Sequence, residues 1–187
     1  MLHLDVHTHN LWAPAGKAII NLPEEALLSP GDFSLREGCL YSVGIHPWWT
    51  EQKMDAYYYG LQLWSMHPQV VAIGECGLDK LRGGSLDFQE EVFLRHLRLA
   101  NELNKPVIIH CVRAFDRLLR LHREVSPLRE RIVHGFRGKP ALARQLLAAG
   151  FYLSFGLYYH EDSFRLTPPE RRYRETDEDF DQTADEF

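Results

Sequence analysis

Short apolar runs recur along this chain, and several of them end beside a histidine or a carboxylate. Residues 70–73 precede Glu75, residues 107–109 precede His110, and residues 132–133 precede His134. Continuous apolar runs of this length are typical of parallel strands that are buried on both faces. The sequence therefore predicts a parallel sheet whose strand ends carry polar side chains.

Eight candidate strands alternate with helical or loop segments. They lie near residues 3–8, 18–22, 41–46, 70–75, 106–111, 131–135, 151–156 and 172–177, and the pattern is weakest in the second. Alternation of this kind favours an α/β sheet, and eight units favour a closed (β/α)8 barrel of the TIM type. In such a barrel the carboxyl ends of the strands form the rim where chemistry is assembled.

The chain is long enough for one sizeable core, with 187 residues of which 45% are hydrophobic. We expect a single barrel domain over residues 1–178, followed by an acidic tail at 179–187 that is disordered by itself. Residues 175–187 contain seven acids and no base. Barrels of this type usually need about 250 residues. The expected barrel is therefore compact and lacks the helix that usually follows the last strand.

The overall charge excludes a protein that wraps a nucleic-acid duplex by electrostatics alone. The formal net charge is -5, because 26 acidic residues outnumber 21 basic ones. Duplex binding of that kind depends on a broad basic surface. Any nucleic-acid substrate would have to be held mainly by metal ions and a local patch of cationic residues.

Cysteine usage and hydropathy favour a cytoplasmic protein that does not enter a membrane. Cys39, Cys76 and Cys111 are odd in number and widely spaced, so a disulfide framework is not expected. Neither a signal-like N-terminus nor an apolar stretch of about 18 residues is recognisable. The sequence leaves the oligomeric state open.

The end of the first strand carries two histidines. Side chains in a strand alternate with a period of two, so His7 and His9 face the same side and can chelate one ion. A His-x-His pair alone is equally compatible with a hydrogen-bonded surface pair. Glu75 adds weight, because an ionised carboxylate at the end of an apolar strand is costly unless it is paired or coordinated. The pattern suits a carboxylate that bridges two cations.

His110 and His134 occupy the same place in successive β/α units. A single histidine there is more often a hydrogen-bonded core residue, but that interpretation does not explain the repetition. Asp177 completes the set in the eighth unit. Imidazole and carboxylate ligands suit zinc, manganese or a related ion, and several carboxylates also admit magnesium. Six candidate ligands exceed the three that one catalytic zinc takes from protein, so the sequence predicts two divalent ions.

These residues lie in motifs that resemble the TatD-type metal-dependent hydrolases of the amidohydrolase-like barrel superfamily. The resemblance extends from residue 4 to residue 178 and is carried by seven short segments in order: DVHTH at 5–9, GIHP at 44–47, AIGECGLD at 72–79, PVIIH at 106–110, HGFRG at 134–138, YLSFG at 152–156 and ETD at 175–177.

The resemblance implies both a ligand set and an activity. By resemblance the metal ligands are His7, His9, Glu75, His110, His134 and Asp177. Members of the family are deoxyribonucleases, often 3′ to 5′ on single strands, with Mg²⁺, Mn²⁺ or Zn²⁺. The implied partner is DNA or another phosphodiester substrate.

Three departures from the family pattern stand out. Residues 171–174, Arg-Arg-Tyr-Arg, replace an apolar strand, and arginines on a strand buried on both faces are costly. Val112 occupies the position at which the family has an arginine, and Arg113 follows it. The usual helix after the eighth strand is not recognisable.

Other polar residues of the expected rim are candidates for substrate binding. His46 ends the third strand and can contact a substrate phosphate or hold the turn at Pro47. Arg113 and Arg137 follow His110 and His134, where a guanidinium can clamp a phosphate or remain solvated. Asp79 can orient a metal ligand, or it can simply belong to a loop turn.

The sequence therefore predicts a hydrolase of phosphodiester bonds, acting on DNA ends. Two ions would polarise the phosphoryl group and activate water, with Glu75 as the bridge and Asp177 as ligand and proton acceptor. The same ligands can activate water against carbon, so an enzyme acting on a cyclic amide, lactone or amine is the alternative within hydrolases. A non-catalytic metal-binding barrel is the alternative from another class.

Overall fold

A computed structural model of the chain describes residues 4–50 and 54–177. The strands are β1 (Asp5–Thr8), β2 (Ala18–Asn21), β3 (Leu40–Val43), β4 (Val70–Asp79), β5 (Val107–Val112), β6 (Arg131–Val133), β7 (Tyr152–Phe155) and β8 (Arg172–Arg174). The helices are α1 (Glu24–Leu28), α2 (Met54–Ser65), α3 (Leu86–Glu102), α4 (Phe115–Glu124), α5 (Pro140–Ala148) and α6 (Glu161–Leu166), with short 3-10 turns η1 (Pro30–Asp32), η2 (Pro47–Trp49) and η3 (Pro169–Arg171). The proposed domain boundary at 178 and the acidic tail at 179–187 lie outside the described residues.

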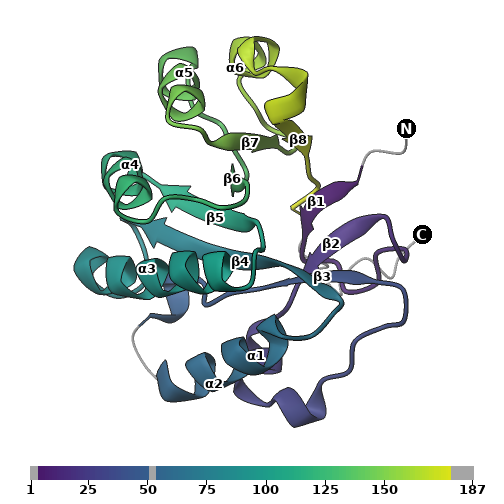
Figure 1. Ribbon diagram of the computed structural model, residues 1–187. Coiled ribbons are helices and arrows are strands. Elements are labelled where there is room, and N and C mark those ends of the chain that lie inside the picture. Colours follow the sequence, from purple (N-terminus) through teal and green to yellow (C-terminus); the bar gives the residue numbers. More distant parts are fainter. Residues whose placement is uncertain (1–3, 51–53, 178–187) are drawn as a thin grey trace.

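The eight strands form a closed parallel barrel in sequence order, which confirms the predicted (β/α)8 fold. The last strand closes the barrel by pairing with the first, with Asp5 opposite Arg174. The helices lie around the outside of the strands (Figure 1). Among the described residues, β8 is the last regular element, and no helix has the length and apolar character required to cross a bilayer.

Alternation along the strands separates the barrel interior from the layer beneath the helices. Ile20, Ile73 and Ile109 belong to the large core that includes the helices. Their neighbours Ile19, Ala72 and Ile108 form a second, smaller cluster. Because residues two apart share a face, Ile19 lies on the side of Asn21 and Ile108 on the side of His110. The barrel interior is therefore apolar toward the amino ends of the strands and polar at their carboxyl ends.

Several expected strands differ from the sequence interpretation: β3 ends at Val43 rather than at residue 46, and β8 ends at Arg174 rather than at residue 177. The fourth strand continues to Asp79 rather than stopping at residue 75, so Glu75 lies within β4. In β8, Arg172 and Arg174 do not enter the barrel. Their guanidinium groups lie 4.1 and 4.3 Å from the ring centre of Phe164 on α6. Stacking on an aromatic ring lets each arginine stay partly in water, so the expected cost of burying it does not arise.

His96 on α3 ties this helix to the rim. It is fully buried; its Nε2 atom accepts a hydrogen bond from the backbone N–H of Ile45 at 2.9 Å, and its Nδ1 atom donates to the carbonyl of Val92 at 2.8 Å. Burial lowers the pKa of His96 to about 4, and the bond to Val92 only partly offsets it. The imidazole is therefore neutral in the folded protein at physiological pH.

We expect the stability of the protein to fall between pH 6.5 and 4 because of His96. The unfolded chain takes up a proton on His96 below about pH 6.5, whereas the folded protein does so only near pH 4. Unfolding is therefore favoured as the pH falls through this window, by up to about 3 kcal/mol. Urea unfolding of His96→Gln at several pH values should show a shallower slope than wild type. His67→Gln on the half-buried turn after α2 should keep the wild-type slope, and equal slopes for all three proteins would contradict the assignment.

Candidate active site at the barrel rim

All six candidate ligands meet at the carboxyl end of the barrel. His7 is on β1 and His9 follows it, Glu75 is on β4, His110 is on β5, His134 follows β6 and Asp177 follows β8. Glu75 and His7 are buried, with side chains 3% and 0% exposed, while Asp177 is 33% exposed. Strands far apart in the sequence therefore place one carboxylate deep in the barrel and another at its opening.

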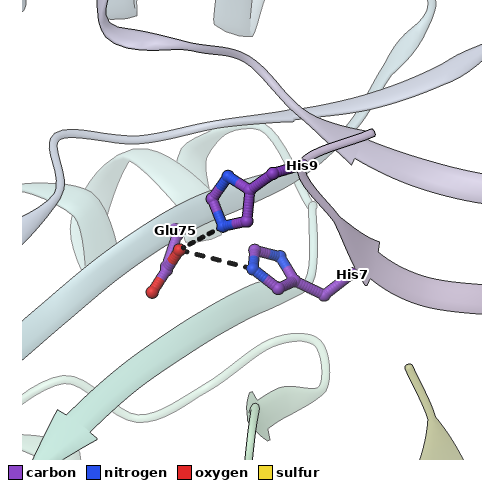
Figure 2. A group of neighbouring side chains, drawn as sticks. All are labelled: His7, His9 and Glu75. Atoms are coloured by element: carbon purple, nitrogen blue, oxygen red, sulfur yellow. Dashed lines mark ion pairs between the residues drawn. The ribbon is translucent and has the colours of Figure 1, made fainter. Parts of the chain in front are cut away.

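The two oxygens of Glu75 face two different sets of histidines. Oε2 lies 3.3 Å from Nε2 of His7 and 3.4 Å from Nε2 of His9. Figure 2 shows both of these rings directed at the carboxylate from the end of β1. Oε1 lies 2.7 Å from Nδ1 of His110 and 2.8 Å from Nε2 of His134. Glu75 is thus the shared member of two groups, as a bridging carboxylate must be.

These distances fit ligands of divalent ions. Two atoms that share one ion at about 2.1 Å each lie roughly 3 to 3.5 Å apart. The donor atoms within His7, His9 and Glu75, and those within His7, His134 and Asp177, all lie within 4.8 Å of one another. In addition, both ring nitrogens of His7 and Nδ1 of His134 are buried without a hydrogen-bond partner. A buried polar atom without a partner is rare, and coordination of an ion would explain it for Nε2 of His7, which faces the carboxylates of Glu75 and Asp177.

His46 is closer to this cluster than its sequence interpretation suggested. Its Nδ1 atom accepts a hydrogen bond from the backbone N–H of Trp48 at 3.2 Å, which holds the turn η2. Since Nδ1 accepts, Nε2 carries the proton and donates to Oε1 of Glu75 at 3.1 Å. Burial lowers the pKa of His46, and the bond to Glu75 opposes this only in part. His46 therefore both positions the turn and orients the central carboxylate.

Asp79 orients His110, as its sequence interpretation allowed. Oδ2 of Asp79 lies 3.2 Å from Nε2 of His110 and accepts a hydrogen bond of 2.7 Å from the indole of Trp48. Gln89 on α3 donates to the carbonyl of Asp79 and accepts from its backbone N–H. An imidazole that donates from Nε2 presents the lone pair of Nδ1 to the cluster.

Glu175 and Asn21 support the site, and the sequence interpretation gave neither a role. Oε1 of Glu175 lies 3.4 Å from Nδ1 of His134 and accepts a hydrogen bond from the backbone N–H of Gly135. Oδ1 of Asn21 accepts from the backbone N–H of Glu75 at 2.7 Å. Two signals were available: Glu175 precedes Asp177 by the strand period of two, and Asn21 is a polar residue ending an apolar run.

Burial and the neighbouring histidines act in opposite directions on the carboxylates. Burial would raise the pKa of Glu75, but His134, His110 and His46 outweigh it and hold that pKa well below its usual range. Burial also raises the pKa of Asp177, and His7 and His134 lower it by more. Both carboxylates are therefore ionised at neutral pH and available to a cation or a proton.

Two cavities adjoin the cluster, and the remaining candidates line them. Arg113 and Arg137 are exposed and line a cavity of about 550 Å³, together with His110, His134 and Asp177. No hydrogen bond or ion pair joins either arginine to the six candidate ligands, all of which are among the described residues. His46 lines the second cavity, of about 370 Å³, with Glu75 and His9. Arg113 has a positive φ of 53°, which is unusual for a residue with a side chain and marks a sharply turned backbone after β5.

Fold and site together define a β/α barrel whose rim carries histidines and carboxylates able to hold metal ions. The family described as TatD related DNase matches residues 34–183. The chain belongs to this family, whose members are metal-dependent.

Two similar proteins from bacteria are each named 3′-5′ ssDNA/RNA exonuclease TatD. The protein of Cronobacter sakazakii is 40% identical over 119 residues, which are 63% of this chain and 45% of that protein. The protein of Escherichia coli K12 is 35% identical over 117 residues, 62% of this chain and 45% of that protein. The chain thus spans about half the length of these relatives.

Solved structures show the same fold at lower identity. The crystal structure of YJJV, a TatD homolog from Escherichia coli K12, aligns with a TM-score of 0.77 at 24% identity, covering 94% of this chain and 79% of that one. A hydrolase of the TatD family from Entamoeba histolytica aligns with a TM-score of 0.70 at 20% identity, covering 94% of this chain and 73% of that one.

Proposed function

We propose that this chain is a metal-dependent hydrolase of phosphodiester bonds that removes nucleotides from the 3′ end of single-stranded DNA. The observation that carries the proposal is the placement of Glu75, whose two oxygens face separate histidine groups. Two-ion sites with a shared carboxylate stabilise both the attacking and the leaving oxygen of a displacement at phosphorus. The names of the two bacterial relatives supply the polymer and the direction.

Two groups of these residues would hold two divalent ions, Mg²⁺, Mn²⁺ or Zn²⁺. His7, His9, Glu75 and Asp177 form one group, and Glu75, His110 and His134 form the other. When bound, the ions polarise the phosphoryl oxygens and lower the pKa of water.

The protein's own groups provide orientation and proton transfer. Asp177 lies at the opening of the site, borders both cavities and is ionised, so its carboxylate can take a proton from the attacking water. His46, Asp79 and Glu175 fix the rings and carboxylate that face the ions. Arg113 and Arg137 bind phosphates of the substrate strand. Three free thiols, Cys39, Cys76 and Cys111, suit a reducing compartment, and we place the protein in the cytoplasm.

Metal binding is the first test. We expect chelator-treated protein to bind about two Mn²⁺ or Zn²⁺ ions per chain in calorimetric titration, since two ligand groups share Glu75. The ions should also raise the unfolding temperature, because they bind only the folded site. Absence of stoichiometric binding would contradict the metal centre.

The reaction is tested on a panel of substrates with the metal-loaded protein. The expected result is that a 5′-labelled single-stranded oligonucleotide becomes shorter one nucleotide at a time, which gives a ladder of labelled products. Hydrolysis of cyclic amides or lactones without any cleavage of the oligonucleotide would replace the proposed function with the alternative within hydrolases.

A further inference from the structure

The two cavities beside the ligand cluster differ in charge. The arginine cavity, of about 550 Å³, is lined by Arg113 and Arg137 and by the aromatic rings of Phe115 and Phe136. The glutamate cavity, of about 370 Å³, is lined by Pro23, Glu24, Trp49 and Glu75. Both include Trp48, His110, His134 and Asp177. The two cavities therefore share part of the candidate ligand set, and the arginine cavity adds a cationic wall where the glutamate cavity adds an anionic wall.

The anionic wall is held in place by its neighbours. Glu24 is in the first turn of α1, directly after the carboxyl end of β2, and its Oε1 atom accepts a hydrogen bond from the hydroxyl of Tyr57 on α2. The ring of Tyr57 stacks on Trp49 with the ring centres 5.9 Å apart and the planes 18° apart. Burial, together with the bond to Glu24, raises the pKa of Tyr57, so the phenol remains a donor. Glu24 is thus a fixed hydrogen-bond acceptor, unlike its exposed neighbour Glu25.

The cationic wall and the anionic wall interact differently with the internal nucleotides of a nucleic-acid strand and with its last nucleotide. Every internal nucleotide carries a phosphate on both sides, which an arginine attracts and a carboxylate repels. The last nucleoside of a strand with a free 3′ end carries only a hydroxyl there. A carboxylate accepts a strong hydrogen bond from a hydroxyl. Glu24 therefore favours the end of a strand and disfavours its continuation.

We propose that Glu24 makes this site selective for strands with a free 3′-hydroxyl. The terminal nucleoside lies in the glutamate cavity with its 3′-hydroxyl directed to Glu24, while the rest of the strand lies in the arginine cavity. The inference rests on the proposed nuclease function and adds the residue that recognises the strand end.

The test compares three oligonucleotides of one sequence that end in a 3′-hydroxyl, a 3′-hydrogen or a 3′-phosphate. Wild type should cleave the 3′-hydroxyl strand with a kcat/KM at least about tenfold above the 3′-phosphate strand, because like charges placed together are costly. Glu24→Gln removes the charge but keeps an acceptor for Tyr57, so the preference over the 3′-phosphate strand should shrink by about tenfold. Glu25→Gln, one residue further along α1, should keep the wild-type ratio.

Two further measurements separate this inference from the proposed function. Arg113→Gln and Arg137→Gln should raise KM for all three strands without changing their ratio. If wild type cleaves none of the strands, the proposed function fails. In that case fluorescence anisotropy measures the dissociation constants of the 3′-hydroxyl and 3′-phosphate strands. The ratio of these two constants is then compared between wild type and Glu24→Gln. An unchanged ratio in Glu24→Gln, or no preference in wild type, overturns the inference.

Discussion

Replacing Glu75 with glutamine is expected to lower turnover of a single-stranded oligonucleotide by about two decades or more. The substitution keeps the size of the side chain and removes the charge that His7, His9, His110 and His134 surround. Loss of one preorganised electrostatic group in an active site typically costs this much. Affinity for the second divalent ion should fall as well, because a neutral amide is a poor bridge between cations.

The control for Glu75→Gln is Glu102→Gln at the exposed C-terminal end of α3. It removes an equal charge far from the rim and should leave turnover and ion binding unchanged. Steady-state kinetics and calorimetric titration measure the two effects on the same preparations. Wild-type turnover in Glu75→Gln would reject the bridging role.

Gly77→Ala is expected to destabilise the protein by about 3 kcal/mol, because the added methyl group would clash sterically with the neighbouring strand. Gly77 has a φ of +146°, and a Cβ atom there would lie 2.0 Å from the backbone carbonyl oxygen of His110. The two residues are partners in the register of β4 and β5. A contact that short forces the strands apart and displaces His110 from Glu75, so ion affinity should fall with stability.

Gly31→Ala is the matched control for Gly77→Ala. An added Cβ at Gly31 meets no atom within 4 Å, and the position lies in the short turn η1. Its free energy of unfolding should stay within about 0.5 kcal/mol of wild type in urea titration. Equal stability of the two variants would show that β4 and β5 separate more easily than the close packing of Gly77 indicates.

The spacing of apolar runs was sufficient to predict the barrel and the meeting of its site residues. Runs such as 107–109 are short enough to be strands buried on both faces, and eight of them in alternation with helical segments leave few architectures. Once the strands are parallel, their carboxyl ends share one rim, so His7, Glu75, His110 and His134 must be neighbours there. The structure brings them together as this argument requires.

The arginines of the eighth strand could not be interpreted from the sequence. The position of these residues in a central strand predicts burial on both faces. The strand pattern does not show whether an aromatic ring from another element lies over the outer face. Phe164, on a different element, gives Arg172 and Arg174 a surface on which to lie. The placement of these side chains depends on packing between α6 and β8, which local periodicity does not encode.

The sequence by itself determined the fold class and the set of candidate ligands, because both depend on periodicity and on the chemistry of single residues. Only the tertiary structure decided which oxygen of Glu75 faces which histidine and that His46 donates to that carboxylate. It also decided that Glu175, Asn21 and Asp79 contact His134, Glu75 and His110, and that Glu24 and Arg137 line different cavities beside these residues. The physical reason is that strand register and helix packing fix these distances to fractions of an ångström, and they arise only when residues far apart in the chain close the barrel.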